Sequence, residues 1–249
     1  MTICAICAED VVDGARFCPQ CGALLGTPSG LEERKLVTAV FADLVGFTSR
    51  SEGMDVEDVR GTLVVYFRLL RQELERFGGT VEKFIGDAVV AIFGAPAAHE
   101  DDPERAVRAA LSIQAVLARA REERPNFDLH VRIGVNTGEA LVAIGANPHA
   151  GEGLAAGDVV NTAARLQTAA PADGVLVGEM TYRATSHVVD YTGAQAIEVK
   201  GKQYPLNVWV AREAASLDAD AGRPLAAPLV GRDAQLEALW STLERVRQE

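Results

Sequence analysis

Apolar and polar residues follow two different periods along this chain, and the change of period separates strands from helices. Residues 35–47, KLVTAVFADLVGF, form an apolar and β-branched run that predicts a buried strand. The next segment places apolar side chains at helical spacing, with Asp55 as the first residue and Gly78-Gly79 as the end. The first part of the main domain therefore reads as a strand followed by a long helix.

Two short strands are expected next, over residues 80–85 and 88–93, and the Gly-Asp pair between them predicts a hairpin. A second helix is predicted over residues 102–124, and an alternating strand over residues 128–136. The order β-α-β-β-α-β predicts an α+β fold with a ferredoxin-like core.

The rest of the chain adds elements to this core and flanks it with smaller segments. The later elements are a short strand near residues 140–145, a glycine-rich loop, a helix over 158–169, a strand over 174–177, a short helix, and strands over 188–200 and 204–210. The predicted organisation is a cysteine module (1–26), a linker (27–34), the main domain (35–212), a linker (213–228) and a helical C-terminal region (229–249).

Composition narrows the classes of function. The chain has 249 residues and a formal net charge of −11, so a nucleic-acid partner is not expected, because phosphate binding needs a basic surface. We see no apolar run long enough to cross a membrane and no signal peptide, so the sequence predicts a cytoplasmic protein without membrane contact. In that compartment thiols stay reduced, and paired cysteines point to metal rather than to disulfides.

All four cysteines lie in the first 26 residues, as two Cys-x-x-Cys pairs separated by ten residues: Cys4, Cys7, Cys18 and Cys21. Two such turns supply the four thiolates of a tetrahedral zinc site, so we predict one structural zinc ion in a zinc-ribbon knuckle. The alternatives are four reduced cysteines packed as small hydrophobic residues, and a redox pair, which needs only one of the two motifs. A site with four protein ligands leaves no open position for catalysis.

Two aspartates interrupt apolar segments. Asp43 lies in the first strand and Asp87 at the tip of the predicted hairpin, and a buried carboxylate without a cation is costly. In a ferredoxin-like sheet these strands are neighbours, so the two carboxylates are expected at one end of the sheet, where they can hold two Mg²⁺ ions. Taken singly, Asp87 also fits a turn residue and Asp43 a strand-end cap. Gly46-Phe47-Thr48 follows as a weak signal for a backbone cradle around a triphosphate.

Four segments together resemble the class III adenylate and guanylate cyclase catalytic domain: FADLVGFTSRSE, VEKFIGDAVVAIFG, VRIGVNTGE and GDVVNTAARLQ. They span about residues 34–212 in the order and spacing of that family. The resemblance implies a ferredoxin-like core with added elements, and a head-to-tail dimer whose active sites lie at the interface. It also implies conversion of a nucleoside triphosphate to a 3′,5′-cyclic monophosphate and pyrophosphate, with two Mg²⁺ or Mn²⁺ ions per site.

The resemblance assigns a role to individual residues. Asp43 and Asp87 match the metal-binding aspartates, the backbone of Leu44 matches a further metal contact, and Phe47 with Thr48 matches the phosphate-binding turn. On the helix over 158–169, Asn161 and Arg165 match the residues that orient the ribose and stabilise charge on the α-phosphate. Lys200 matches a contact to the terminal phosphates. Without the resemblance, Arg165 reads as a surface arginine and Lys200 as a turn lysine.

Base recognition by resemblance involves two positions. Lys83 matches the lysine that reads the base, and a lysine donor suits N1 of adenine, which accepts a hydrogen bond. The second position holds Leu154, which cannot accept a hydrogen bond from the adenine amine, so weaker selectivity for ATP is expected. We therefore predict a homodimeric adenylate cyclase in intracellular signal transduction. The alternatives are a weakly active or inactive nucleotide-binding regulatory module and a guanylate cyclase.

Two further features concern regulation rather than chemistry. LVGRDAQLEAL, at residues 229–239, resembles the entry into an AAA-type or signal-transduction ATPase region, without a phosphate-binding loop after it. The zinc ribbon and this C-terminal region are candidate docking sites for a regulatory domain or protein. The four histidines, His99, His130, His149 and His187, match no motif and read as surface or packing residues.

Overall fold

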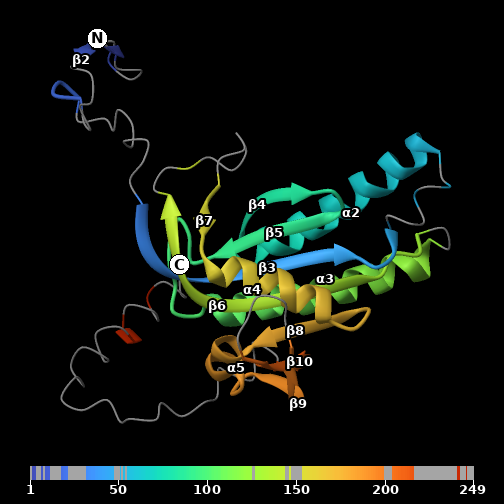
Figure 1. Ribbon diagram of the computed structural model, residues 1–249. Helices are drawn as coiled ribbons and strands as arrows, with labels where there is room; N and C mark the ends of the chain where they lie inside the picture. The colour runs from blue at the N-terminus through green and yellow to red at the C-terminus, as the bar shows by residue number, and fades with distance from the viewer. Residues whose placement is uncertain are drawn as a thin grey trace. The chain divides into compact units, whose positions relative to one another are not determined.

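The structure is a computed structural model, and it describes most of the main domain (Figure 1). The described residues are 2–3, 7, 9–11, 18–21, 32–47, 51, 53, 55–124, 127–143, 146, 153–198, 204–215, 240–241 and 245. The chain divides into two compact units, Met1–Ala214 and Ala215–Glu249.

The described elements follow one another as β1 (Thr2–Ile3), β2 (Asp10–Val11), β3 (Glu32–Leu44), α2 (Val56–Arg76), β4 (Thr80–Ile85), β5 (Ala88–Phe93), α3 (Asp102–Glu123), β6 (Val131–Ala143), β7 (Ala155–Ala156), α4 (Asp158–Ala169), β8 (Gly174–Gly178), α5 (Glu179–Thr185), β9 (Val189–Ile197) and β10 (Leu206–Ala214). Asp55 caps α2 by accepting a hydrogen bond from the backbone of Glu57.

The larger sheet of the described residues has eight strands, in the order β4-β5-β3-β6-β8-β10-β9, with β7 paired to β6. Its first four strands, β4-β5-β3-β6, have the antiparallel order of a ferredoxin-like core, connected as β-α-β-β-α-β. β6 and β8 are parallel, and α4 lies between them in sequence. The predicted α+β fold is therefore confirmed.

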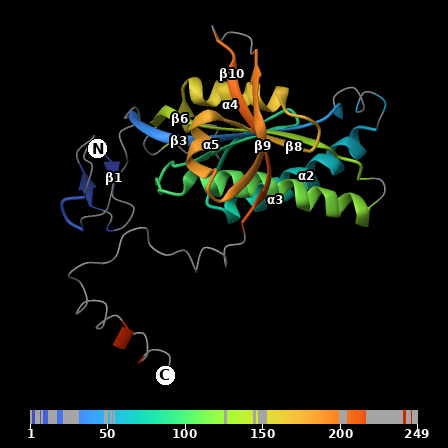
Figure 2. The same cartoon turned by 90° about the horizontal axis from the view of Figure 1, so that it is seen from below.

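The helices divide between the two faces of this sheet (Figure 2). α2 and α3 cover one face, where fully buried side chains such as Tyr66 and Ile113 pack against Val40 and Ile133. α4 covers the other face, over β3 and β6. Burial on both faces explains why β3 reads as a nearly continuous apolar run.

Contact between α4 and the sheet is close because β6 has a glycine beneath the helix. A Cβ atom at Gly134 would overlap the backbone oxygen of Ala163 and the backbone nitrogen of Gln167. Backbone atoms cannot rotate away, so only glycine lets the helix lie at this distance. Gly134 thereby sets the height of α4 above the ends of β3 and β6.

A chain of buried hydroxyl groups crosses the middle of the sheet. Thr137 on β6 lies 2.9 Å from the hydroxyl of Thr38 on β3 and 2.9 Å from that of Thr181 on α5. All three residues are buried, so each hydroxyl satisfies another where water is absent. These hydroxyl contacts let β6 continue through a polar stretch. β6 is therefore one strand of 13 residues, where the sequence predicted two separate strands.

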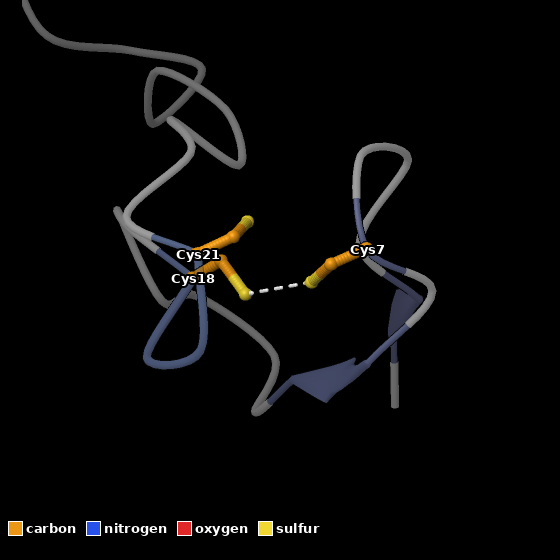
Figure 3. A group of neighbouring side chains, drawn as sticks. All are labelled: Cys7, Cys18 and Cys21. Atoms are coloured by element: carbon orange, nitrogen blue, oxygen red, sulfur yellow. Dashed lines mark hydrogen bonds between the residues drawn. The ribbon is translucent and has the colours of Figure 1, made fainter.

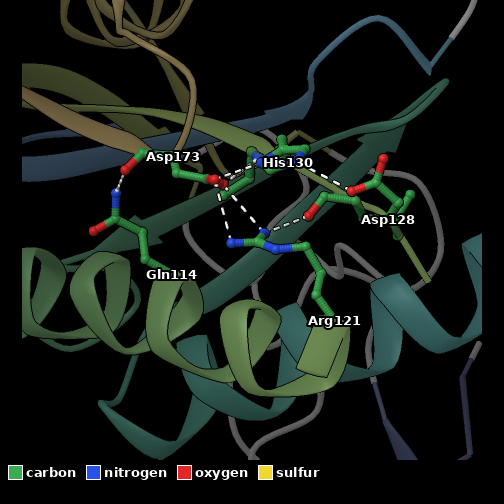
Figure 4. A network of polar contacts seen from close by, with 7 residues as sticks. Gln114, Arg121, Asp128, His130 and Asp173 are labelled. Atoms are coloured by element: carbon green, nitrogen blue, oxygen red, sulfur yellow. Dashed lines mark hydrogen bonds and ion pairs between the residues drawn. The ribbon is translucent and has the colours of Figure 1, made fainter. Parts of the chain in front are cut away.

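The turn before β8 centres on Asp173, which has a positive φ of 52° (Figure 4). Its carboxylate lies 2.5 Å from Nδ1 of His130 and 3.3 Å from two guanidinium nitrogens of Arg121, and it accepts a hydrogen bond from the backbone of Val131. Its carbonyl accepts a further bond from Gln114 on α3. His130 thus belongs to an ion-pair network, beyond the packing role that the sequence indicated.

The remaining differences concern ends of elements. The final strands are Val189–Ile197 and Leu206–Ala214, shifted by up to four residues from the expected ranges. Of the predicted C-terminal region, only Trp240, Ser241 and Arg245 lie among the described residues. No helix within the described ranges combines the length and hydropathy needed to span a membrane.

Candidate active site

Asp43 and Asp87 meet at one end of the sheet, as the strand order predicted. Asp43 is the penultimate residue of β3, and Asp87 lies in the turn that joins β4 to β5. β3 and β5 are hydrogen-bonded neighbours, with Ala42 opposite Val89, so the ends of the two segments adjoin. Gly86 makes the turn at a φ of 63°, in the left-handed region that favours glycine.

The two carboxyl groups interact directly. Burial raises the pKa of Asp43 above its usual value of 3.8, and the negative charge of Asp87 raises it further. Two donors oppose this rise: the backbone N–H of Leu44 and the side chain of Gln167 both donate to the carboxylate, and each lowers the pKa of Asp43. The net shift of the Asp43 pKa is upward, because burial and the neighbouring charge of Asp87 outweigh the two donors.

Tyr66 lies in the core near this pair. Its ring is fully buried in α2, and its pKa is raised well above 10.0, first by burial and then by the charges of Asp43 and Asp87. Among the described residues, the hydroxyl has no hydrogen-bond partner. The Tyr66 phenol therefore stays neutral and adds no charge beside the acidic pair.

Gln167 connects α4 to the acidic pair. Its Nε2 atom donates a hydrogen bond of 3.3 Å to Oδ2 of Asp43, and the residue is only 8% exposed. A neutral donor of this kind orients the carboxylate without neutralising it. Gly134 makes this contact possible, because it lets the helix lie close to the sheet.

The segment after β3 turns beside the acidic pair. The backbone N–H of Val45 donates a bond of 2.8 Å to the carbonyl of His130, and Phe47 is 4% exposed in the main core. The side chain of Leu44 is also buried and has no ligand atom, so only its backbone carbonyl could contact a metal ion. Thr48, the other half of the proposed phosphate turn, lies outside the described residues, as does Lys200.

Two residues assigned to base recognition differ in environment. Lys83 lies on β4, with its side chain 48% exposed, and its Nζ atom is 3.2 Å from Oε1 of Glu82. Leu154 is 2% exposed in an apolar cluster with Val37 and Val159, and its carbonyl accepts a bond of 3.0 Å from Ala143. Lys83 is therefore available to a ligand, while the side chain of Leu154 contributes to the core.

Asn161 and Arg165 lie four residues apart on α4, so they share one face of that helix. Asn161 is exposed and Arg165 is half-buried. The Nη1 atom of Arg165 is buried and has no hydrogen-bond partner among the described residues. Among the described residues, neither side chain forms a hydrogen bond or an ion pair with the acidic pair of its own chain.

Three of the four cysteines lie close together (Figure 3). The sulfur atoms of Cys7, Cys18 and Cys21 are within 4.8 Å of one another, and those of Cys7 and Cys18 are 3.5 Å apart. Sulfur atoms bound to one tetrahedral zinc ion at about 2.3 Å are separated by about 3.8 Å, so this arrangement fits zinc. Cys4 lies outside the described residues.

Sequence reasoning missed three residues of this region. Gln167 follows Leu166 on the buried side of α4, and a polar residue on an apolar helix face was the available signal. Tyr66 gave no signal, because an aromatic residue at helical spacing reads as core. Glu82 reads as an ordinary strand residue, although it is 3% exposed.

A cavity of about 670 Å³ lies elsewhere, beside the turn before β8 and the β9–β10 pair. It is lined by Asp173, Thr192 and Arg212, and by none of the site residues described above. An active site that two chains complete together need not enclose a cavity within one chain. The acidic pair, and not this cavity, is the candidate centre for chemistry.

Comparison with known proteins gives a consistent result. Residues 31–212 match the family described as the adenylate and guanylate cyclase catalytic domain. Adenylate cyclase 1 of Rhizobium meliloti (strain 1021) is 32% identical over 189 residues, which cover 71% of this chain and 27% of that protein. The chain thus spans about a quarter of the length of this curated relative.

Two solved structures have nearly equal similarity to the chain. The adenylyl cyclase CyaB from P. aeruginosa has a TM-score of 0.68 and 28% identity, covering 74% of this chain and 97% of its own. The guanylyl cyclase Cya2 has a TM-score of 0.69 and 29% identity, covering 75% and 96%. Because these two differ in the base they use, the choice of base depends on the residues of this chain. With the family match over residues 31–212 and the acidic pair at its expected place, the chain belongs to the family of class III adenylate and guanylate cyclase catalytic domains.

Proposed function

We propose that this protein is an adenylate cyclase that converts ATP to 3′,5′-cyclic AMP and pyrophosphate. The observation that carries the proposal is the pairing of Asp43 with Asp87 at the end of the sheet, and the exposed side chain of Lys83 adds a donor for the base. The acidic pair suits the phosphates through bound cations, and the lysine suits the base. Such an activity would serve intracellular signal transduction.

Asp43 and Asp87 would hold two Mg²⁺ or Mn²⁺ ions, with the backbone carbonyl of Leu44 as an additional oxygen ligand. Hard divalent cations prefer such oxygen ligands, and they would neutralise the charge of Asp87, which after burial is the second cause of the raised pKa of Asp43. When bound, the ions activate the attacking oxygen and neutralise charge on the leaving phosphates. Gln167 would keep the Asp43 carboxylate oriented.

In the proposed reaction, the 3′ oxygen of the ribose forms a bond to the α-phosphorus. The bond from that phosphorus to the bridging oxygen breaks, pyrophosphate leaves with the electron pair, and the 3′-hydroxyl proton passes to solvent. The turn at Phe47 and Thr48, together with Lys200, would bind the phosphates. Arg165 would stabilise charge on the α-phosphate, and Asn161 would orient the ribose.

Lys83 supports ATP over GTP. Its exposed ammonium group can donate to N1 of adenine, whereas N1 of guanine carries a hydrogen and cannot accept. The buried side chain of Leu154 offers no acceptor for the adenine amine. Selectivity would therefore depend mainly on Lys83.

A head-to-tail homodimer would complete the site. Within the described part of the chain, Asn161 and Arg165 form no hydrogen bond or ion pair with the acidic pair, and the exposure of Asn161 leaves it accessible to a second copy. In a symmetric dimer each chain would supply the metal ligands of one site and Lys83, Asn161 and Arg165 of the other. A monomer would be inactive.

The test is to incubate the purified protein with Mn²⁺ and either ATP or GTP, and to identify the cyclic product by chromatography. Cyclic AMP formed from ATP, and lost in Asp43→Ala, is the expected result. Preferential formation of cyclic GMP would instead identify a guanylate cyclase. A wild type with no more product than Asp43→Ala would refute the cyclase assignment.

A second candidate is a nucleotide-binding regulatory module with little or no turnover. The apolar side chain at Leu154 favours it, because base contacts would be incomplete. Calorimetric binding of ATP without cyclic product would identify this function.

We further propose that Cys4, Cys7, Cys18 and Cys21 bind one structural zinc ion. The proximity of the three described sulfur atoms supports this site. Together with the C-terminal region, it is a candidate docking site for a regulatory partner.

A further inference from the structure

Glu82 on β4 is the most anomalous charged residue near the proposed base site. Its side chain is 1% exposed, and among the described residues neither carboxylate oxygen has a partner in hydrogen-bond geometry. A carboxylate withdrawn from water destabilises the folded chain unless a nearby cation and aligned donors offset the loss of hydration. Its presence here therefore calls for a compensating role.

A β-bulge determines where Glu82 points. Val81 pairs with Ala91, and Lys83 pairs with the adjacent Val90, so Glu82 is an extra residue without a partner on β5. In a regular strand, successive side chains point to opposite faces and do not meet. At the bulge this rule is broken, and bulges commonly redirect a side chain beside an active site.

At the bulge, the side chain of Glu82 meets the side chain of the next residue, Lys83. Oε1 of Glu82 lies 3.2 Å from Nζ of Lys83, which is an ion pair. The same oxygen is 3.8 Å from the position of a Cβ atom at Gly153, the residue before Leu154. The carboxylate thus lies between the lysine and the segment that carries the second base position.

The two members of this pair differ in exposure. The carboxylate is enclosed, whereas the side chain of Lys83 is 48% exposed. The contact with Glu82 is an ion pair and not an aligned hydrogen bond, so the three donors of the ammonium group stay available to a ligand. In this arrangement the enclosed Glu82 carboxylate can orient the exposed Lys83 ammonium group.

We propose that Glu82 is a positioning residue that holds the Lys83 ammonium toward N1 of an adenine base, and so determines the preference for ATP. This inference rests on the proposed function. Glu82 acts through Lys83 and does not itself contact the nucleotide, because its oxygens are covered. Leu154 offers no side-chain acceptor that could hold the lysine instead.

The experiment compares Glu82→Gln, Glu82→Met, Lys83→Met and the Glu82→Gln/Lys83→Met double variant in the full chain. Turnover is measured with ATP, GTP and 1-deaza-ATP, which lacks the N1 acceptor, and calorimetry measures binding of the same nucleotides. Glu104→Gln is the matched control, because it breaks a glutamate–arginine pair on α3, at 2.7 Å from Arg108.

We expect Glu82→Gln to lower kcat/KM for ATP about three- to tenfold, the effect of a charge-assisted contact that is partly screened by water. The change should appear in KM and in ATP binding. Glu82→Met should have at least this effect, and GTP and 1-deaza-ATP should change less than about twofold. In the Lys83→Met background, Glu82→Gln should have no additional effect, since the two residues act as one unit.

Thermal unfolding separates this role from a purely structural one. Removing the buried charge should leave the melting temperature of Glu82→Gln unchanged or raise it. Equal losses for ATP and GTP, additive effects with Lys83→Met, or a lower melting temperature with an unchanged ATP preference would overturn the inference. If the wild type binds ATP without turnover, the proposed enzymatic function fails, and the binding measurements still decide the role of Glu82.

Discussion

Asp43→Asn is expected to stabilise the metal-free protein while removing its response to divalent cations. In the wild type, a half-buried carboxylate faces a second carboxylate, and both burial and Asp87 raise the pKa of Asp43. Asparagine removes the charge, and its carbonyl oxygen can still accept a hydrogen bond from the backbone of Leu44 or from Gln167. The residue that serves catalysis should therefore weaken the fold when no metal is bound.

The size of this effect follows from the charges. Two unit charges about 5 Å apart repel by about 1–3 kcal/mol at an effective dielectric constant between 20 and 80. Because Asp43 is only partly buried, the lower end of this range applies, about 1 kcal/mol. For a domain of this size, that corresponds to a rise of about 2–4 °C in the melting temperature.

The pH dependence gives a second signature with a defined sign. A carboxyl group with a raised pKa in the folded state binds its proton more tightly there than in the unfolded chain. The stabilising contribution of this proton is complete below pH 3.8, the usual pKa of the group. The contribution is lost as the pH rises through the elevated pKa of the folded state. Across this window, the metal-free wild type should lose stability relative to Asp43→Asn.

Differential scanning calorimetry in chelator and in Mn²⁺, between about pH 3.5 and 7, measures both effects. Asp190→Asn, at an exposed position on β9, is the control for loss of one negative charge. Mn²⁺ should raise the melting temperature of the wild type and of the control, but not that of Asp43→Asn. A metal-free Asp43→Asn protein that melts below the wild type at neutral pH would refute this reasoning.

Four other changes test separate parts of the structure. Gly134→Ala should cost at least about 1–3 kcal/mol in chemical denaturation, since the new methyl group meets the backbone of α4, whereas Gly61→Ala, with open space around it on α2, should be neutral or stabilising. Thr137→Val should cost about 1–3 kcal/mol by the same measurement, because it leaves two buried hydroxyls without their partner. Arg165→Ala should lower kcat about 10²- to 10³-fold with a small change in KM, in steady-state assays with ATP. Cys21→Ser should reduce zinc content measured by mass spectrometry, while residues 34–212 expressed alone keep their cyclase activity.

Each of these four expectations would be contradicted by a specific outcome. Equal stability of Gly134→Ala and Gly61→Ala would show that α4 can move off the sheet at no cost. An unchanged Thr137→Val protein would mean that water replaces the hydroxyl. For Arg165→Ala, a rise in KM alone would indicate ground-state binding. Loss of activity in a folded 34–212 chain would show that the zinc ribbon contributes to catalysis.

The sequence predicted the acidic pair because its signal is local. An aspartate in an apolar strand and another at a hairpin tip are visible in the residue pattern, and the strand order of the fold brings them together. It predicted a break in β6 incorrectly, because Thr137 and Gly138 look like a turn in isolation. The hydroxyl of Thr137 is satisfied by Thr38 and Thr181, and Gly138 pairs with Val37 on β3; all three partners are distant in sequence.

Glu82 and Gln167 escaped prediction for related reasons. The role of Glu82 depends on a bulge, which is a mismatch between two strands and cannot be read from one of them. The role of Gln167 depends on the depth at which α4 lies over β3, and that depth is set by Gly134 on a third element. A residue pattern identifies sites whose environment is set by residues nearby in sequence. It does not identify residues such as Glu82 and Gln167, whose environment is set by tertiary contacts.

The network around Asp173 also limits how the chain can be engineered. Asp173, in the turn between α4 and β8, binds Gln114 and Arg121 on α3. It also binds His130 and Val131 at the start of β6. An inserted peptide or an altered loop length at this turn would break all of these contacts together, although surface connections usually tolerate insertions. Reporter domains, affinity tags or new chain termini should therefore be placed elsewhere, and the short connection from α4 to β8 should be kept at its present length.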